Sequence, residues 1–256
     1  MSKQEAARIA LITGAGRGLG KSMALHLAER GTDLVITYRS SDKEAAEVVA
    51  AAQKLGRKAV ALRLDVADSR SFGAFAEAVQ AKLKEVWQRD RFDFLVNNAG
   101  IGADASFAET TEQQFDELVA TNLKGPFFLS QRLLPLIADG GRVLNVSSGL
   151  ARFSFPGKSA YAMTKGGIEV LTRYMAKELG ARGITVNTLA PGAIETDFGG
   201  GAVRDNKQLN AAVAGQTALG RVGLPDDIGR AAAMLLSPEA NWITGQRVEF
   251  SGGMML

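Results

Sequence analysis

The chain has 256 residues, with 30 lysines and arginines, 27 aspartates and glutamates, one histidine and no cysteine. Without cysteine it can form no disulfide, thiolate nucleophile or cysteine zinc site, and the lone His26 excludes a clustered histidine site, so no metal is expected. A net charge of +3, evenly interleaved, does not indicate nucleic acid. The apolar run near the N-terminus is too short for a signal or membrane span, which predicts a cytoplasmic protein.

Short apolar runs rich in β-branched residues alternate with longer helical patterns along the chain. The expected strands are Arg8–Ile12, Asp33–Thr37, Lys58–Arg63, Phe92–Val96, Arg142–Val146, Thr185–Leu189 and Gln246–Phe250. The expected helices are Leu19–Arg30, Asp42–Leu55, Ser69–Trp87, Thr111–Ile137, Ala160–Gly180 and Pro225–Leu236. This alternation predicts a doubly wound α/β fold of Rossmann type, with a parallel seven-stranded sheet covered on both faces. No linker or repeat interrupts it, so residues 1–256 are expected to form a single domain.

The segment 193–223 departs from the regular alternation. It contains Gly199-Gly200-Gly201 and a polar stretch from Arg204 to Asn210 before the next clear helical pattern. Long connections of this kind near strand ends are usually functional. We therefore expect this segment, called the lid below, to cover a substrate site.

A glycine-rich turn directly follows the first strand and opens the first helix. It runs Gly14-Ala15-Gly16-Arg17-Gly18-Leu19-Gly20. Glycines allow a sharp turn and a close approach of the backbone to a diphosphate, and the helix N-terminus favours the anion. An ordinary strand-to-helix turn is the alternative, but the flanking strand and helix supply the context that dinucleotide binding requires.

The end of the second strand carries Tyr38-Arg39-Ser40 where NAD-binding sites place an acid for the adenosine ribose. Arg39, with Arg17 from the glycine turn, suits a 2′-phosphate, since planar multi-donor cations pair well with phosphate. NADP(H) is therefore favoured over NAD(H), although both arginines could instead be solvated surface charges. Asp65-Val66, after the third strand, is placed to meet the adenine; a helix N-cap is the alternative role for Asp65.

Tyr161 and Lys165 are spaced i and i+4 on one face of a predicted helix. A free tyrosine has a pKa near ~10, so acid/base work at neutral pH needs a nearby positive charge, which Lys165 is spaced to supply. Taken alone, the pair could equally be a partly buried tyrosine beside a snorkelling lysine.

The sequence resembles the short-chain dehydrogenases/reductases over nearly its whole length. The resemblance rests on the glycine turn, Asn97-Asn98-Ala99-Gly100, Asn122, Ser148 thirteen positions before Tyr161, Tyr161-x-x-x-Lys165 and Pro191-Gly192. It implies a carbonyl–alcohol oxidoreductase with a nicotinamide cofactor. By position, Tyr161 exchanges the proton, Lys165 lowers its pKa and holds the nicotinamide ribose, Ser148 binds the substrate oxygen, and Asn122 anchors a water linking Lys165 to solvent. Ser147 is the competing serine.

The same resemblance implies further contacts around the cofactor and the substrate. Asn98, Ala99 and Gly100 would floor the adenosine side, while Pro191, Gly192, Ile194 and Thr196 would border the nicotinamide. The expected substrate pocket contains Ser148, Leu150, Arg152, Phe153, Phe155 and Phe198. Its aromatic residues favour an apolar or aromatic carbonyl, and Arg152 could meet an anionic group.

Within the family the chain looks most like the 3-oxoacyl-acyl-carrier-protein reductases. These usually carry two basic surface positions for the acidic carrier; here Arg182 stands at one, but Asp139 stands near the other. The function expected is NADPH-dependent reduction of a ketone, aldehyde or 3-oxoacyl group. A sugar or polyol dehydrogenase using both cofactors is one alternative, and a non-catalytic dinucleotide-binding regulator is another.

The family resemblance also implies self-association. The helical patterns Thr111–Ile137 and Ala160–Gly180 are long enough to pair across a two-fold axis, and the apolar tail Met254–Leu256 suits a second interface. A homotetramer is therefore expected.

Overall fold

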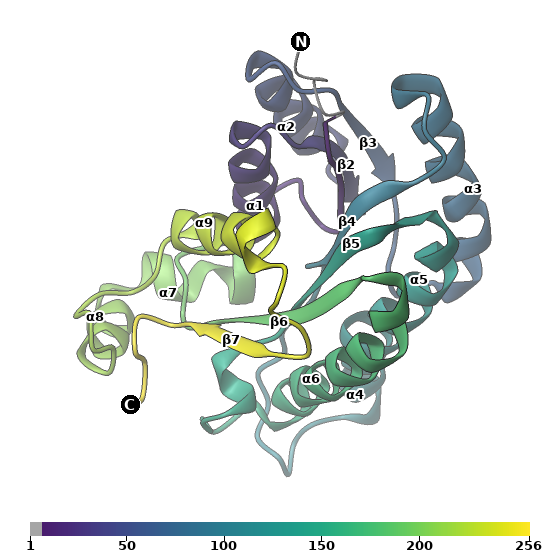
Figure 1. The fold of residues 1–256 in the computed structure, drawn as a ribbon. Helices are drawn as coiled ribbons and strands as arrows, with labels where there is room; N and C mark the ends of the chain where they lie inside the picture. The colour runs from purple at the N-terminus through teal and green to yellow at the C-terminus, as the bar shows by residue number, and fades with distance from the viewer. Residues whose placement is uncertain (1–6) are drawn as a thin grey trace.

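A computed structural model describes residues 7–256 and shows one parallel sheet of seven strands in the order β3-β2-β1-β4-β5-β6-β7 (Figure 1). The strands are β1 (Ile9–Ile12), β2 (Asp33–Tyr38), β3 (Ala59–Arg63), β4 (Phe92–Asn97), β5 (Ile137–Val146), β6 (Thr185–Pro191) and β7 (Arg247–Phe250). Each neighbouring pair is parallel. The order reverses direction at β1 and β4, which confirms the doubly wound fold.

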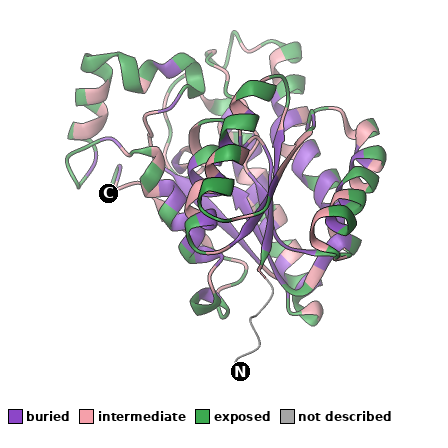
Figure 2. Ribbon diagram, turned by 90° about the horizontal axis from the view of Figure 1, so that it is seen from above, coloured by how far each residue is buried: buried purple, intermediate pink, exposed green. Residues whose placement is uncertain are grey.

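Helices cover both faces of the sheet (Figure 1). On one face lie α1 (Gly18–Glu29), α2 (Asp42–Lys54) and α9 (Pro225–Leu235). On the other lie α3 (Phe72–Lys82), α4 (Glu112–Val119), α5 (Gly125–Leu133) and α6 (Ser159–Leu179). Figure 2 shows the consequence, a buried sheet between helices whose outer surfaces are exposed. Burial of β1 on both faces explains its continuous apolar sequence, because no strand side faces water.

The predicted helix Thr111–Ile137 is interrupted in the structure. It forms α4, a π-helical turn at Ala120–Lys124, α5 and a short 3₁₀ turn, and Ile137 already belongs to β5. Pro126 lacks the N–H that an uninterrupted α-helix would use, which favours the wider turn just before it. The turn matters for the site because it carries Asn122.

The lid contains a 3₁₀ turn, Phe198–Gly201, followed by α7 (Ala202–Asp205) and α8 (Lys207–Gly215). Gly199, Gly200 and Gly201 take φ values of +63°, +72° and +77°, a left-handed run that favours glycine over other residues. The side chain of Asn206 caps α8 by accepting from the backbone N–H groups of Gln208 and Leu209, each at 3.0 Å. The lid therefore contains two helices, and the glycine run Gly199–Gly201 connects them to the segment that follows β6.

Within residues 7–256, no helix has the length and apolar character needed to cross a membrane.

Candidate active site

A cleft of about 750 Å³ opens at the carboxyl ends of the strands, where doubly wound sheets bind their ligands. All the residues expected to bind the cofactor line it: Gly14, Gly16, Arg17, Gly18, Leu19, Gly20, Tyr38, Arg39, Ser40, Asp65, Val66, Asn98, Ala99, Gly100, Tyr161, Lys165, Pro191, Gly192, Ile194 and Thr196. The topology thus gathers residues from six separate connections into one elongated site.

The glycine turn is shaped by close backbone approaches. Gly14 and Gly18 have φ values of +64° and +55°, and a Cβ on Gly20 would lie 2.4 Å from the carbonyl oxygen of Gly14. The helix α1 begins at Gly18 with no side chain capping its N-terminus. Its first N–H groups therefore remain available to an anion, and the residues present fit the diphosphate of a dinucleotide.

The turn Asn98–Gly100 is fastened to the glycine turn. The hydroxyl of Thr13 accepts from the N–H groups of Asn98 and Ala99 at 3.0 and 2.9 Å, and the Asn98 amide donates to the Thr13 carbonyl at 2.9 Å. These bonds hold the floor of the cleft between β1 and β4. Both segments depend on backbone geometry, which leaves few substitutions that preserve it.

The adenosine end of the cleft gathers Arg17, Arg39 and Ser40 as expected. Glu44, in the first turn of α2, also lines it, and the sequence reasoning did not single it out. The side chain of Asp65 accepts from the N–H of Ala67 at 2.9 Å within the turn after β3, and the residue lines the cleft. The alternative role of Asp65 as a helix N-cap is wrong, because Asp68 caps the following 3₁₀ turn.

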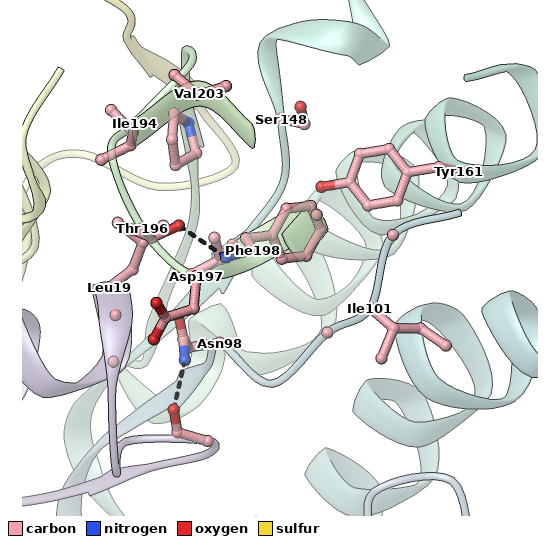
Figure 3. Close-up of a pocket in the computed structure, with 18 of the residues that line it drawn as sticks. Leu19, Asn98, Ile101, Ser148, Tyr161, Ile194, Thr196, Asp197, Phe198 and Val203 are labelled. Atoms are coloured by element: carbon pink, nitrogen blue, oxygen red, sulfur yellow. Dashed lines mark hydrogen bonds between the residues drawn. The ribbon is translucent and has the colours of Figure 1, made fainter. Parts of the chain in front are cut away.

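Ser148, Tyr161 and Lys165 meet in the middle of the cleft. Ser148 follows β5, while Tyr161 and Lys165 lie one turn apart on α6, and the hydroxyl of Tyr161 points toward Ser148 (Figure 3). The ammonium Nζ of Lys165 lies 5.6 Å from the centre of the Tyr161 ring and donates to the Val146 carbonyl at 2.9 Å. The hydroxyl of Ser147 is engaged elsewhere, with Glu169 at 2.8 Å and the Lys165 carbonyl at 3.2 Å, so Ser148 is the serine that faces Tyr161 (Figure 3).

Burial shifts both titratable groups of this centre toward their neutral forms. Burial raises the pKa of Tyr161 to about 12, with the Ser148 hydroxyl acting in the opposite direction. Burial lowers the pKa of Lys165 to about 8. Desolvation is therefore the main influence on the pKa of Tyr161 in the free protein, and the lowering of that pKa by Lys165 stays a prediction.

Asn122 lies behind the cleft and does not line it. Its amide oxygen accepts from the N–H of Ile101 at 2.9 Å, and its NH₂ donates to the Ile101 carbonyl at 2.9 Å and to the Thr164 hydroxyl at 3.3 Å. The side chain therefore fastens the loop at Ile101 to α6, since both ends of the amide are engaged. The structure thus shows a positioning contact for Asn122, and its expected role as the anchor of a water linked to Lys165 stays a prediction.

Aromatic side chains form much of the substrate end of the cleft. Phe153 and Phe155 pack edge to face with ring centres 5.7 Å apart, and the Phe198 ring lies 5.9 Å from that of Tyr161 (Figure 3). Leu150 lines the same region. Phe198 comes from the lid, so the lid places an aromatic ring beside the expected proton donor.

Arg152 does not line the cleft, so its expected place in the substrate pocket is wrong. Its guanidinium donates to both carboxylate oxygens of Glu249, at 2.9 and 2.8 Å, and to the Met254 and Met255 carbonyls at 2.7 and 3.1 Å. Glu249 and the two carbonyls therefore occupy the N–H groups of Arg152 that an anionic substrate would need.

Several further residues of the lid, the tail and the loop after β4 line the cleft and were missed: Ile101, Val203, Leu209, Val213 and Met254. Leu209 and Val213 stand four apart on α8, a helical spacing that could have indicated an inward face. Met254 was expected in a subunit contact, but only 4% of it is exposed and it packs within its own chain, whereas Leu256 is 96% exposed.

Comparison with known proteins identifies the family to which the chain belongs. The profile of a family described as enoyl-(acyl carrier protein) reductase matches residues 14–255. The chain is 40% identical to the 3-oxoacyl-[acyl-carrier-protein] reductase FabG of Staphylococcus aureus (strain Mu50), covering 96% of this chain and 98% of that protein. It is 36% identical to the hydroxynaphthalene reductase-like protein Arp2 of Metarhizium brunneum, covering 97% and 95%.

Among solved structures, the angucycline C-6 ketoreductase LanV with bound NADP superposes with a TM-score of 0.92 at 35% identity, covering 97% of this chain and 95% of that one. The span matched by the family model includes the glycine turn, the Ser148–Tyr161–Lys165 group and the lid. The chain therefore belongs to the short-chain dehydrogenase/reductase family and is an NADP(H)-dependent oxidoreductase of carbonyl groups.

Proposed function

We propose that this reductase acts on a ketone carried by a flat, apolar ring system. The observation that carries the proposal is the aromatic wall of Phe153, Phe155 and Phe198 beside Ser148 and Tyr161. Burial of a planar apolar substrate against such a wall is favourable, whereas the rings offer few hydrogen-bond partners to a flexible polar substrate. The similarity to a relative named for hydroxynaphthalene, a fused aromatic bicycle, supports the same substrate class.

The charged groups near this end also support an uncharged substrate. Arg152 is held by Glu249, and Lys158, which lines the cleft, forms an ion pair with Asp104. A sugar would need partners for several hydroxyl groups, and an anionic substrate would need an open cation. The paired charges favour a neutral ketone over both.

The catalytic roles that we propose follow from the geometry of Ser148, Tyr161 and Lys165. The chemistry supplied by bound NADPH is the hydride. Ser148 positions the ketone oxygen by hydrogen bonding, and Tyr161, which is protonated at neutral pH, gives that oxygen its proton. Lys165 supports the tyrosinate that remains, and with Thr196 it orients the nicotinamide end of the cofactor.

An acyl carrier protein is not favoured as a partner. Arg182, the basic position that carrier docking would use, donates to Asp139 at 2.7 Å and to the Leu134 carbonyl at 3.1 Å. Its guanidinium also reaches the Ile137 carbonyl at 2.5 Å. These contacts occupy the group that an acidic carrier surface would bind.

A substrate panel tests the proposal. NADPH consumption is followed with a bicyclic aromatic ketone such as 1-tetralone, an acetoacetyl thioester free and on acyl carrier protein, and a ketose, with the alcohol products identified by mass. We expect the bicyclic ketone to have the highest kcat/KM. A carrier-bound thioester that is reduced fastest would refute the substrate class and leave the carbonyl chemistry intact.

We also propose a cytoplasmic homotetramer. Phe127 and Phe128 on α5 and Val170 and Tyr174 on α6 are between 41% and 66% exposed, an apolar surface on the helices expected to pair. Light scattering that gives a monomer mass would contradict the assembly. Cell fractionation, with the protein recovered outside the cytoplasmic fraction, would contradict the location.

A further inference from the structure

Glu249, near the end of β7, receives hydrogen bonds from three side chains at once. Its carboxylate accepts two bonds from Arg152 at 2.9 and 2.8 Å, one from Arg247 at 2.7 Å and one from Ser251 at 2.7 Å. Only 17% of the side chain is exposed. Hydrogen bonding by Arg152, with support from Ser251 and Arg247 against the effect of burial, lowers the pKa of Glu249 to about 2.

From Glu249 one branch leads to the walls of the substrate end. Arg152 lies 5.2 Å from the centre of the Phe153 ring and donates to the carbonyls of Met254 and Met255. Phe153 and Met254 both line the cleft. Arg152 therefore fixes two pocket walls from outside the pocket.

The second branch leads to the catalytic serine. Arg247 donates to the carbonyl of Ser148 at 3.3 Å and to Glu169 at 2.7 Å. Glu169 in turn accepts from the hydroxyl of Ser147 at 2.8 Å. Arg247 thus holds Ser148 through its backbone carbonyl and Ser147 through Glu169 and the Ser147 hydroxyl, and the position of Arg247 itself depends on Glu249.

The tail is tied to the lid at the same place. Thr217, just after α8, pairs with Met254 as an antiparallel bridge, and the N–H of Met255 donates to the Gln216 carbonyl at 3.0 Å. The carboxylate that holds Arg152 thereby acts on the lid as well, through two residues of the tail.

We propose that Glu249 is a positioning residue for ketone reduction, setting the pocket walls through Arg152 and the orientation of Ser148 through Arg247. It touches neither ketone nor cofactor. A small displacement of a reacting group lowers the rate of the reaction without abolishing substrate binding. The branch to Ser148 should therefore affect kcat and the branch to the pocket walls should affect KM, so kinetics can separate them. The inference rests on the carbonyl reduction described above and holds for whichever ketone the wild type reduces.

The first test replaces Glu249 by Gln, which keeps its shape and removes its charge. With the ketone that the wild type reduces fastest, we expect kcat/KM to fall about tenfold because the serine and the walls lose their fixed geometry. The Kd for NADPH should stay within about twofold, since neither branch reaches the adenosine end. Glu249→Asp should recover part of the loss, because it keeps the charge at a shorter reach.

The matched control is Glu85→Gln, which breaks an exposed ion pair with Lys82, 2.8 Å long, on the π-helical turn Leu83–Trp87. We expect no change in kcat/KM. If the two Gln variants lose the same activity, or if Glu249→Gln keeps wild-type kinetics, the proposal is overturned.

The branches are then separated by Arg152→Met and Arg247→Met. Arg152→Met should raise KM with little change in kcat, whereas Arg247→Met should lower kcat with little change in KM. Lysine at either position should restore only part of the lost activity, because it cannot replace a forked donor.

Should Glu249→Gln fail to fold, the lysine variants decide: unchanged kinetics in both would overturn the proposal. Absent turnover in the wild type would count against the assay ketone, whereas losses confined to the variants support the inference.

Discussion

The two ends of the cleft are built from different materials. The cofactor end consists of backbone: glycines of the β1–α1 turn, the open N-terminus of α1 and the Asn98–Gly100 turn. The substrate end consists of side chains: aromatic rings from two loops, apolar residues of the lid and Met254 of the tail. A backbone site is fixed by local geometry and serves one ligand, whereas a side-chain site can change its ligand by single substitutions. The predictions below test this contrast.

The largest effect is expected at Tyr161, where the two ends meet. Tyr161→Phe removes the proton donor but keeps the buried ring, so kcat should fall about 10³-fold. The Kd for NADPH should change by no more than about twofold, because the hydroxyl is needed only for the proton transfer. Steady-state kinetics and fluorescence titration with NADPH measure the two quantities. Full turnover by this variant would refute the catalytic assignment.

A methyl group at the cofactor end should weaken NADPH binding strongly. In Gly20→Ala the new Cβ would lie 2.4 Å from the Gly14 carbonyl oxygen and 2.6 Å from the Asn98 amide. Relief requires movement of the backbone that faces the diphosphate, and the Kd for NADPH should rise about 100-fold, by analogy with overpacked cores.

The control is Gly73→Ala in α3, where an added Cβ would meet nothing within 4 Å. That change should leave cofactor binding intact and stabilise the helix by about 1 kcal/mol. Equal binding losses in both alanine variants would contradict a backbone-built cofactor end.

The buried Lys165 should make stability depend on pH. Its folded pKa of about 8 lies below its ordinary value of 10.5, so burial penalises the charged form. This cost is present in full below pH 8 and is relieved as pH rises toward 10.5, because the folded state then holds fewer protons than the unfolded one. From pH 8 to pH 10 the wild type should gain about 2 kcal/mol in unfolding free energy relative to Lys165→Met. Urea unfolding at both pH values measures the difference; a parallel pH dependence in the two proteins would contradict it.

A smaller effect is expected from the arginine at the adenosine end. Arg39→Ala should reduce the preference for NADPH over NADH about tenfold, as expected for one charge-assisted phosphate contact. The measurement is the ratio of kcat/KM for the two cofactors. An unchanged ratio would mean that other residues bind the 2′-phosphate of NADPH, and Arg17 would be tested next.

The same contrast explains which features the sequence could predict. The strands, the glycine turn and the Tyr161–Lys165 pair follow from local pattern, because their geometry depends on neighbours within a few residues. The roles of Arg152 and Met254 do not, since Arg152 meets Glu249 only after the chain has folded. The π-helical turn at Asn122 was also beyond reach, because helical periodicity does not distinguish it from the α-helix that was expected.

The contribution of Phe198 tests the central claim most directly. The measurement is the ratio of kcat/KM for a bicyclic aromatic ketone to that for an acetoacetyl thioester, with NADPH, in the wild type and in Phe198→Ala. We expect the wild-type ratio to exceed about ten and to approach one in the variant, while the Kd for NADPH stays constant, because the ring belongs to the substrate end alone. A ratio that does not change, or a loss of NADPH binding that accounts for the change, would contradict the account.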